Sequence, residues 1–191
     1  MIVGLLLAAG GARRFGSQKL VAPFRGRALV RHAAETLVRS TATTIVVVGR
    51  DAQMVRDALD GVVNRIVENP DWATGMASSV RVGIDAVPPD ARAVLIALGD
   101  QPGVPPDIGR AVIAGWHESG KPIVAPRFRD GRGHPVLFAR EVFDELRSLA
   151  GDVGARSVIE RIPERVAEVV IDAEMPSDVD TPEDLDRLAA P

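Results

Sequence analysis

The sequence predicts an α/β fold built on a mostly parallel sheet. Short aliphatic runs alternate with longer amphipathic stretches, an order typical of parallel strands covered by helices on both faces. The first run ends in a glycine-rich basic loop, and ligands of such sheets bind beyond the carboxyl ends of the strands. An Asp-Gly pair between two short strand-like pieces predicts an antiparallel hairpin in the C-terminal third.

The individual elements follow from residue type and spacing. Aliphatic runs predict strands at 2–8, 44–48, 62–67, 93–98 and 122–125, and amphipathic stretches predict helices at 28–39, 51–59, 76–87 and 106–118. After the hairpin at Asp130-Gly131 we expect helices at about 139–149 and 152–161 and a strand at 165–171. The segment DTPEDL predicts a last helix with Thr181 as N-cap, Pro182 at its first position and Asp184 three residues past the cap.

Composition sets limits on the class of protein. The length of 191 residues predicts one domain, and the net charge of −3 gives no global attraction for nucleic acid or an anionic membrane. The absence of cysteine excludes disulfides, thiolate metal sites and a cysteine nucleophile. The N-terminal apolar run lacks a basic region before it and a cleavage site after it, so we expect a cytoplasmic protein without a membrane segment.

The loop after the first strand has the chemistry of a phosphate cradle. Ala8, Ala9, Gly10 and Gly11 allow a ligand to approach the backbone closely, and backbone N–H groups in such loops form an anion nest. Arg13, Arg14 and Lys19 add positive charge, and Lys19 is one of only two lysines among 23 basic residues. The loop fits neither the Walker A pattern nor G-x-G-x-x-G. A basic surface loop without a ligand is the alternative interpretation.

Three aspartates are candidates for a metal site. Asp100 follows the strand at 93–98, on the ligand edge of the sheet, and Mg²⁺ takes one or two carboxylates together with phosphate oxygens. Asp178 and Asp180 alternate along an extended segment, so we expect them to point the same way. The alternatives are a turn-initiating aspartate before Pro102 and a local Asx turn.

Other segments offer weaker signals. Gly75, Ser78 and Ser79 could present N–H and hydroxyl groups to a base or ribose, although helix capping and small-residue packing explain them equally well. His134 follows a flexible glycine pair, and a histidine there suits either a structural role or contact with an acidic ligand. Arg156 lies near an expected helix N-terminus, where anions bind well.

Six motifs in order resemble the MobA/MocA-type nucleotidyltransferases. They are the loop Leu7-Ala8-Ala9-Gly10 with Arg14, Gly16 and Lys19, then N-x-x-W-x-x-G-M-x-S-S, G-D-Q-P, G-H-P-V-L-F, G-D-x-G-A-R and D-V-D-T-P-E-D-L. The resemblance covers nearly the whole chain. One departure is Ala12, where the family usually has a serine or glycine, so a hydroxyl contact to phosphate is missing.

The resemblance implies a Rossmann-like three-layer nucleotidyltransferase fold and a set of site residues. The domain of residues 1–191 would bind the nucleotide through about 1–105 and the acceptor through about 106–191. Lys19, Arg14 and Asp100 would be catalytic, and Mg²⁺ would bind Asp100 and Asp180. The implied nucleotide contacts are Leu7, Ala8, Ala9, Gly10, Gly11, Arg14, Lys19, Gly75, Ser78, Ser79 and Gly99, and the implied acceptor contacts are Gln101, His134 and Arg156.

The implied reaction is transfer of CMP from CTP to the phosphate of a molybdopterin-type cofactor, with release of pyrophosphate. The Ala8-Ala9-Gly10 form and G-D-Q-P resemble the cytidylyl branch, so CTP is expected over GTP. A molybdoenzyme that receives the product is a possible partner, and we expect a monomer or weak homodimer. Alternatives are transfer to another acceptor such as a sugar phosphate or phospholactate, a non-catalytic cofactor-delivery or regulatory protein, and an oxidoreductase.

Overall fold

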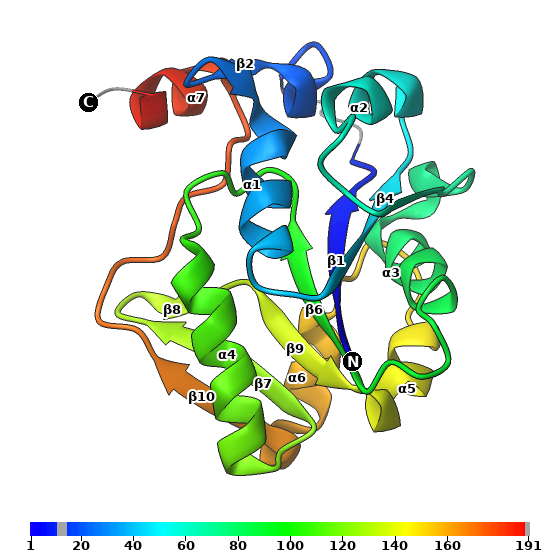
Figure 1. Cartoon of the computed structure of the whole chain (residues 1–191), viewed down its shortest axis with the longest axis vertical. Helices are drawn as coiled ribbons and strands as arrows, with labels where there is room; N and C mark the ends of the chain where they lie inside the picture. Colours follow the sequence, from blue (N-terminus) through cyan, green and yellow to red (C-terminus); the bar gives the residue numbers. More distant parts are fainter. Residues whose placement is uncertain (11–14, 190–191) are drawn as a thin grey trace.

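The computed structural model describes residues 1–10 and 15–189, and one mixed sheet forms its centre (Figure 1). Within these residues the strand order is β10-β7-β9-β6-β1-β4-β5, with β8 paired to β7. The strands are β1 (Ile2–Ala8), β4 (Thr43–Val48), β5 (Arg65–Glu68), β6 (Ala93–Leu98), β7 (Ile123–Phe128), β8 (Gly131–Arg132), β9 (Val136–Ala139) and β10 (Val166–Val170).

The sheet is parallel except around β9. β1 pairs in parallel with both β4 and β6, so Leu5 lies between Ile45 and Ile96 in register. β9 enters between β6 and β7 and is antiparallel to both, because the turn at Asp130-Gly131 reverses the chain after β7. The predicted fold class, a mostly parallel sheet with an antiparallel hairpin in the C-terminal third, is confirmed.

Helices cover both faces of the sheet. On one face α1 (Leu29–Val38) and α2 (Ala52–Ala58) cover β4, and α4 (Pro106–Ser119) covers β7 and β10; their aliphatic side chains form one cluster with Leu6 and Val46. On the other face α3 (Met76–Asp85), α5 (Phe143–Arg147) and α6 (Arg156–Arg161) contribute to a second cluster, which includes Val3 and Leu5. Alternate residues of each strand point to opposite faces, so continuous aliphatic strands supply both cores.

The sequence placed most elements to within two or three residues, and the exceptions have local causes. The expected helix at 139–149 is a 3-10 turn at Arg140–Val142 followed by α5. The helix expected to begin at 152 begins at Arg156, because residues 151–154 form a turn against the start of α3. A small second sheet of β2 (Pro23–Phe24) and β3 (Arg27–Ala28) was not predicted, since two-residue strands leave no periodic pattern.

The last helix, α7 (Pro182–Ala189), has the predicted cap. Asp184 N–H donates to Thr181 Oγ1 at 3.2 Å, and Thr181 N–H donates to Asp184 Oδ2 at 2.9 Å. The helix lies beside β2, where Arg25 Nη2 donates to the Leu188 carbonyl at 3.0 Å (Figure 1). The cap fixes the direction of the chain immediately after Asp180.

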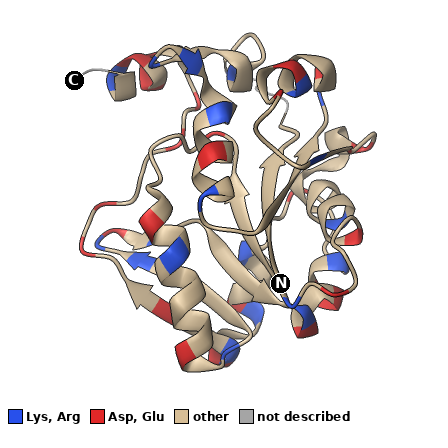
Figure 2. Ribbon diagram, viewed as in Figure 1, with Lys and Arg blue, Asp and Glu red and all other residues tan. Residues whose placement is uncertain are grey.

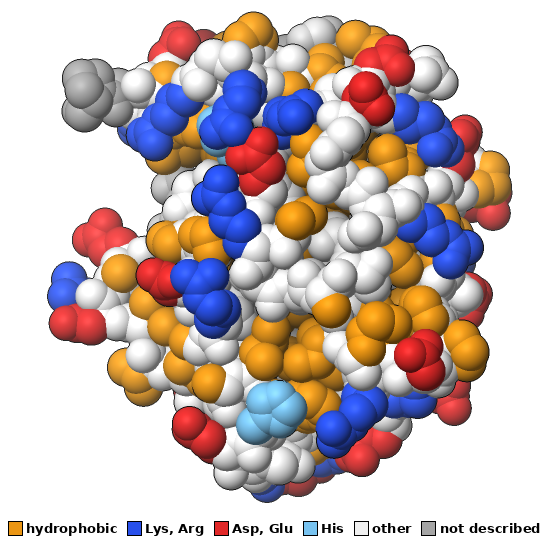
Figure 3. Space-filling model, in the orientation of Figure 1, with side chains coloured by type: hydrophobic (Ala, Val, Ile, Leu, Met, Phe, Trp, Pro, Cys, Tyr) orange, Lys and Arg blue, Asp and Glu red, His pale blue; other side chains and the backbone are white. Residues whose placement is uncertain are grey.

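Charged side chains of both signs are dispersed along the chain (Figure 2) and over the face of the molecule that Figure 3 shows. The described helices include none with the length and apolar character needed to cross a bilayer.

Candidate active site

A cavity of about 470 Å³ opens at the carboxyl edge of the sheet, where β1 and β6 end. This volume lies in the range of about 300–1,000 Å³ found for small-molecule sites. Its walls come from five parts of the chain, which contribute Leu7, Ala8, Ala9, Gly10, Lys19, Leu20, Trp72, Ala73, Thr74, Gly75, Met76, Ser79, Leu98, Asp100 and Asp152. The cavity is therefore where the topology of a parallel sheet puts a ligand.

Among the described residues that line this cavity, Lys19 is the one with a positively charged side chain. It begins a 3-10 turn (Lys19–Val21) in which the Gln18 side chain caps the Leu20 N–H. Leu20, only 3% exposed, anchors the turn in the core. The Lys19 ammonium donates to Asp100 Oδ2 at 2.8 Å, to the Val179 carbonyl at 2.8 Å and to Asp180 Oδ1 at 3.2 Å. Residues 81 and 161 positions away along the chain thus converge on one nitrogen.

Electrostatics keep Lys19 charged. Burial disfavours the ammonium and is the largest single influence on its pKa, but the attraction of Asp100 and Asp180 outweighs it. The pKa of Lys19 is accordingly raised above its ordinary value. The cavity therefore presents a permanent cation at neutral pH.

The two aspartates of the C-terminal motif face different neighbours. Val179 N–H donates to the Asp100 carbonyl at 3.0 Å, and the Val179 side chain is fully buried, so the extended segment 178–180 is fixed against the end of β6. Asp180 contacts Lys19, whereas Asp178 accepts from Gln101 Nε2 at 2.6 Å. Burial, with Asp100 and Asp180 nearby, raises the pKa of Asp178 above its ordinary value.

The free backbone N–H groups in the first turn of α3 find acceptors in residues 151–152. Met76 N–H donates to Asp152 Oδ1 and Ala77 N–H to the Gly151 carbonyl, both at 3.3 Å. Gly75 has φ of +117°, and a Cβ there would lie 2.4 Å from the Gly151 carbonyl oxygen, so only glycine fits this approach. The start of α3 and the 151–152 turn form one wall of the cavity.

Ser78 and Ser79 differ in what their hydroxyl groups have left to offer. Both accept from Asn69 Nδ2, at 2.8 and 3.0 Å. Ser78 Oγ also donates to the carbonyls of Asp71 and Gly75, and the residue does not line the cavity. Ser79 lines it, and no acceptor for its hydroxyl lies in the part of the chain that the structure describes. Ser79 is thus the serine available to a ligand.

A second cavity, of about 400 Å³, lies on the side of the hairpin. Its lining includes the apolar Val136, Phe138 and Ile159. Three arginines, at 127, 132 and 156, and two carboxylates, at 130 and 160, also line it. His134 also lines it. The chain segment 152–156 contributes to both cavities, since Asp152 lines the first and Arg156 the second.

The structure brings together most of the site residues that the sequence suggested. Those lining the first cavity are Leu7, Ala8, Ala9, Gly10, Lys19, Gly75, Ser79 and Asp100, and those lining the second are His134 and Arg156. Ser78, Gly99, Gln101 and Asp180 line neither. Gly99 packs between β1 and Leu20, Gln101 is 5% exposed and points to Asp178, and Asp180 reaches the first cavity only through its contact with Lys19. Gly11 and Arg14, like Ala12, lie outside the described residues.

Some lining residues were missed. Trp72, Met76 and Asp152 line the first cavity, and all three stand inside motifs that the sequence displays. Arg127 and Arg132 line the second cavity, but nothing distinguishes them among 21 arginines. Only the fold brings them to one rim.

The carboxylates suit a hard divalent cation. The described residues contain no group of three histidine, cysteine, aspartate or glutamate side chains arranged to hold a metal. The carboxylates of Asp100 and Asp180 nevertheless lie close together, because both contact the Lys19 ammonium. Mg²⁺ and Mn²⁺ bind one or two carboxylates and fill their remaining coordination positions with phosphate oxygens and water.

Comparison with known proteins decides the family. The MobA-like NTP transferase domain matches residues 4–166. The chain belongs to this family.

Relatives of this MobA-like chain have more than one activity. A nicotine blue oxidoreductase from Paenarthrobacter nicotinovorans is 36% identical, with 98% of this chain and 96% of that protein covered. A molybdenum cofactor cytidylyltransferase from Escherichia coli is 23% identical, with 94% and 91% covered. The structure of Rv0371c from Mycobacterium tuberculosis in complex with manganese has a TM-score of 0.83 at 32% identity, covering 98% of this chain and 97% of that one.

Proposed function

We propose that the chain transfers CMP from CTP to the phosphate of a molybdopterin-type cofactor and releases pyrophosphate. The observation that carries this proposal is the placement of Lys19 between Asp100 and Asp180 in the wall of the first cavity. A cation and two carboxylates at the end of β1 match what a triphosphate and its divalent metal require.

The chemistry needs no covalent intermediate. An oxygen of the acceptor phosphate attacks the α-phosphorus of CTP in line, a new P–O bond forms, and the bond from the α-phosphorus to the leaving pyrophosphate breaks. Both reactants are anionic, so the chain's task is to hold them together and to neutralise charge. Lys19 meets the triphosphate with a charge that its carboxylate partners keep in place.

Asp100 and Asp180 are the residues that we assign to Mg²⁺ or Mn²⁺. The metal supplies Lewis-acid polarisation of the phosphate and shields its charge when bound. The manganese complex of Rv0371c supports a divalent metal in this family.

The second cavity suits the acceptor. Its apolar residues suit a flat heterocycle, and its three arginines, which outnumber the two carboxylates beside them, suit a phosphate. Trp72 and Met76 in the first cavity offer surfaces on which a base can pack. CTP rather than GTP is proposed from the cytidylyl-type motifs at Ala8-Ala9-Gly10 and G-D-Q-P and from the likeness to the cytidylyltransferase.

A pyrophosphate-release assay tests the proposal. CTP, GTP and ATP are each supplied with Mg²⁺ or Mn²⁺, with and without a molybdopterin-type acceptor. We expect release that depends on both CTP and the acceptor, that is lost in Lys19→Met and that persists in Lys121→Met, whose lysine lies on the surface at the Glu164 carbonyl. A preference for GTP would overturn the choice of nucleotide, and absence of release with every triphosphate would overturn nucleotidyl transfer.

Hydride transfer is the second candidate, favoured by 36% identity to nicotine blue oxidoreductase. Its test is oxidation of NADH or NADPH in the presence of nicotine blue. Turnover there, with no pyrophosphate released from any triphosphate, would favour the redox activity.

A further inference from the structure

Two buried polar atoms stand out because they lack hydrogen bonds. Among the described residues, Gln101 Oε1 and His134 Nδ1 are the only buried side-chain nitrogen or oxygen atoms with no partner. Both residues line one small cavity of about 10 Å³ between α1 and the end of β6. A space of about 10–15 Å³ holds one water molecule.

The orientation of Gln101 is fixed by its other end. Its Nε2 donates to Asp178 Oδ1 at 2.6 Å. Turning the amide over would bring its oxygen against the carboxylate oxygen, and two acceptors repel at that distance. Oε1 therefore faces away from Asp178 and needs a donor, because an unpaired buried acceptor costs about 1–3 kcal/mol.

The protein around this cavity has no hydroxyl left to donate. Thr36 Oγ1 donates to the Val104 carbonyl at 3.1 Å, and Ser40 Oγ lies 3.0 and 3.1 Å from the carbonyls of Thr36 and Pro106. The remaining lining residues within the described part are apolar: Ala33, Leu37, Ala97, Leu98, Val104 and Pro135.

We propose that one buried water occupies this cavity, hydrogen-bonded to Gln101 Oε1 and His134 Nδ1, and that Gln101 is a positioning residue for the segment 178–180. A water has two hydrogens and meets both needs when Nδ1 of neutral His134 carries a lone pair. Burial lowers the pKa of His134, which favours the neutral ring.

The water completes a chain of contacts from His134 through Gln101 to Asp178. Val179 and Asp180 follow Asp178 directly, and both contact the Lys19 ammonium. Gln101 therefore acts on Lys19 through the position of this segment and without touching a ligand. This inference does not depend on nucleotidyl transfer, because it concerns only hydrogen bonds of Gln101 and His134 within the protein.

A high-resolution crystal structure of the unmodified chain is the first test. We expect a single density peak within hydrogen-bonding distance of Gln101 Oε1 and His134 Nδ1. A dry cavity, or a side-chain arrangement in which either atom finds a protein partner, would overturn the water site.

Two variants test the positioning role. Gln101→Met keeps the volume but removes both the donor and the acceptor, and we expect the water to be lost and the Asp180 carboxylate to move from Lys19. Thr36→Val is the matched control, because it lines the same cavity with a hydroxyl that is already paired, and we expect the water and segment 178–180 to stay. An unmoved segment 178–180 in Gln101→Met would show that Gln101 does not position it.

A solution measurement accompanies the crystal structures. The imidazole ¹⁵N shifts of His134 distinguish a hydrogen-bonded Nδ1 from a free one, and the chain has only two other histidines. We expect the hydrogen-bonded signature in the unmodified chain and in Thr36→Val, and the free one in Gln101→Met. The free signature in the unmodified chain would contradict the proposal even if every variant failed to fold.

Discussion

The two cavities hold their charges in different ways. In the first, Lys19 is nearly buried and two carboxylates fix its position. In the second, the arginines are exposed; Arg132 pairs with Glu168, Arg156 pairs with Glu160 at 2.9 Å, and the Arg127 guanidinium has no ion pair or hydrogen bond to the described residues. A buried ion pair depends on the whole fold, whereas exposed pairs exchange partners at little cost.

From this difference we infer that the first cavity carries the chemistry of the proposed transfer and that the second binds the acceptor. We infer that the first cavity is preorganised and that the second adjusts to its ligand. The turn at 151–154 contacts the start of α3 and leads into α6, so a ligand in either cavity acts on a shared wall.

Loss of the buried cation should have the largest effect. In Lys19→Met we expect transfer to fall by about 10²–10³-fold, the usual effect of removing one preorganised group that stabilises charge. Steady-state rates of pyrophosphate release measure it, with circular dichroism as the check on folding. A rate near that of the unmodified chain would mean that Lys19 is not part of the catalytic machinery.

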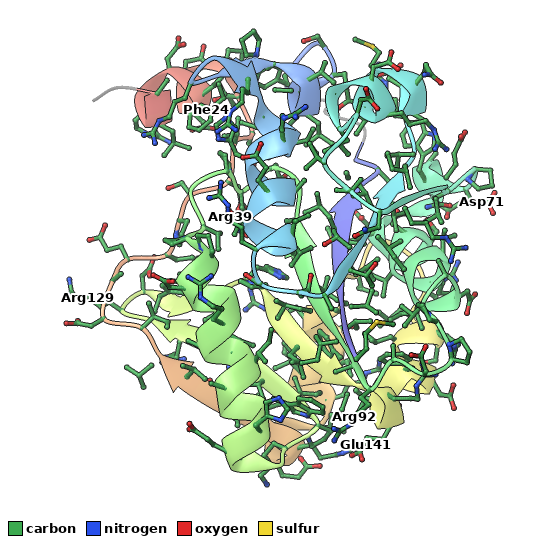
Figure 4. The ribbon with its side chains drawn as sticks, in the orientation of Figure 1. Phe24, Arg39, Asp71, Arg92, Arg129 and Glu141 are labelled. Atoms are coloured by element: carbon green, nitrogen blue, oxygen red, sulfur yellow. The ribbon has the colours of Figure 1, made fainter. Side chains whose placement is uncertain are left out.

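A smaller effect on turnover is expected from substitutions in the second cavity. Arg127→Ala should raise KM for the acceptor by about tenfold, the equivalent of one charge-assisted hydrogen bond, and leave KM for CTP unchanged. Arg129→Ala is the matched control: Arg129 projects from the loop after β7, pairs with Asp172 and does not line the cavity (Figure 4). Equal effects of the two substitutions would remove the second cavity from acceptor binding.

Substitutions of the neighbouring Ser79 and Ser78 should have different effects, the first on nucleotide affinity and the second on the free energy of unfolding. Ser79→Ala should weaken nucleotide binding severalfold, because Ser79 lines the first cavity and its hydroxyl can still donate a hydrogen bond. Ser78→Ala should instead lower the free energy of unfolding by about 1–3 kcal/mol, since the buried Ser78 hydroxyl pairs with the Asn69 amide and with the carbonyls of Asp71 and Gly75. Calorimetric titration measures the nucleotide affinity of both variants, and denaturant unfolding measures their stability. Weaker nucleotide binding in Ser78→Ala alone would contradict the assignment of Ser79 to the nucleotide.

The smallest effect concerns acid stability. Burial lowers the pKa of His134 in the folded chain below its ordinary value of 6.5, so unfolding takes up a proton as the pH falls below that value. The stability that neutral His134 contributes is complete above about pH 6.5 and is lost as the pH falls through the folded pKa. His134→Gln should flatten this part of the stability profile, and an unchanged slope in urea unfolding at several pH values would contradict it.

The sequence predicted the first cavity better than the second for a physical reason. Residues of the first follow strands directly, as Gly10 follows β1 and Asp100 follows β6, so the topology of a parallel sheet brings them to one edge. The contact of Lys19 with Asp180 depends on the path of an irregular segment, and no periodic pattern encodes that path. Arg127 and Arg132 come together through the β7–β8 hairpin, whose register the sequence does not specify.

The central claim is that the first cavity holds a nucleoside triphosphate and its metal through Lys19, Asp100 and Asp180. A crystal structure with a non-hydrolysable CTP analogue and Mn²⁺ tests it most directly, because the anomalous signal of manganese locates the metal independently. We predict a manganese peak at the Asp100 and Asp180 carboxylates and triphosphate oxygens within hydrogen-bonding distance of the Lys19 ammonium. A nucleotide bound elsewhere, or a metal bound away from both aspartates, would contradict the account.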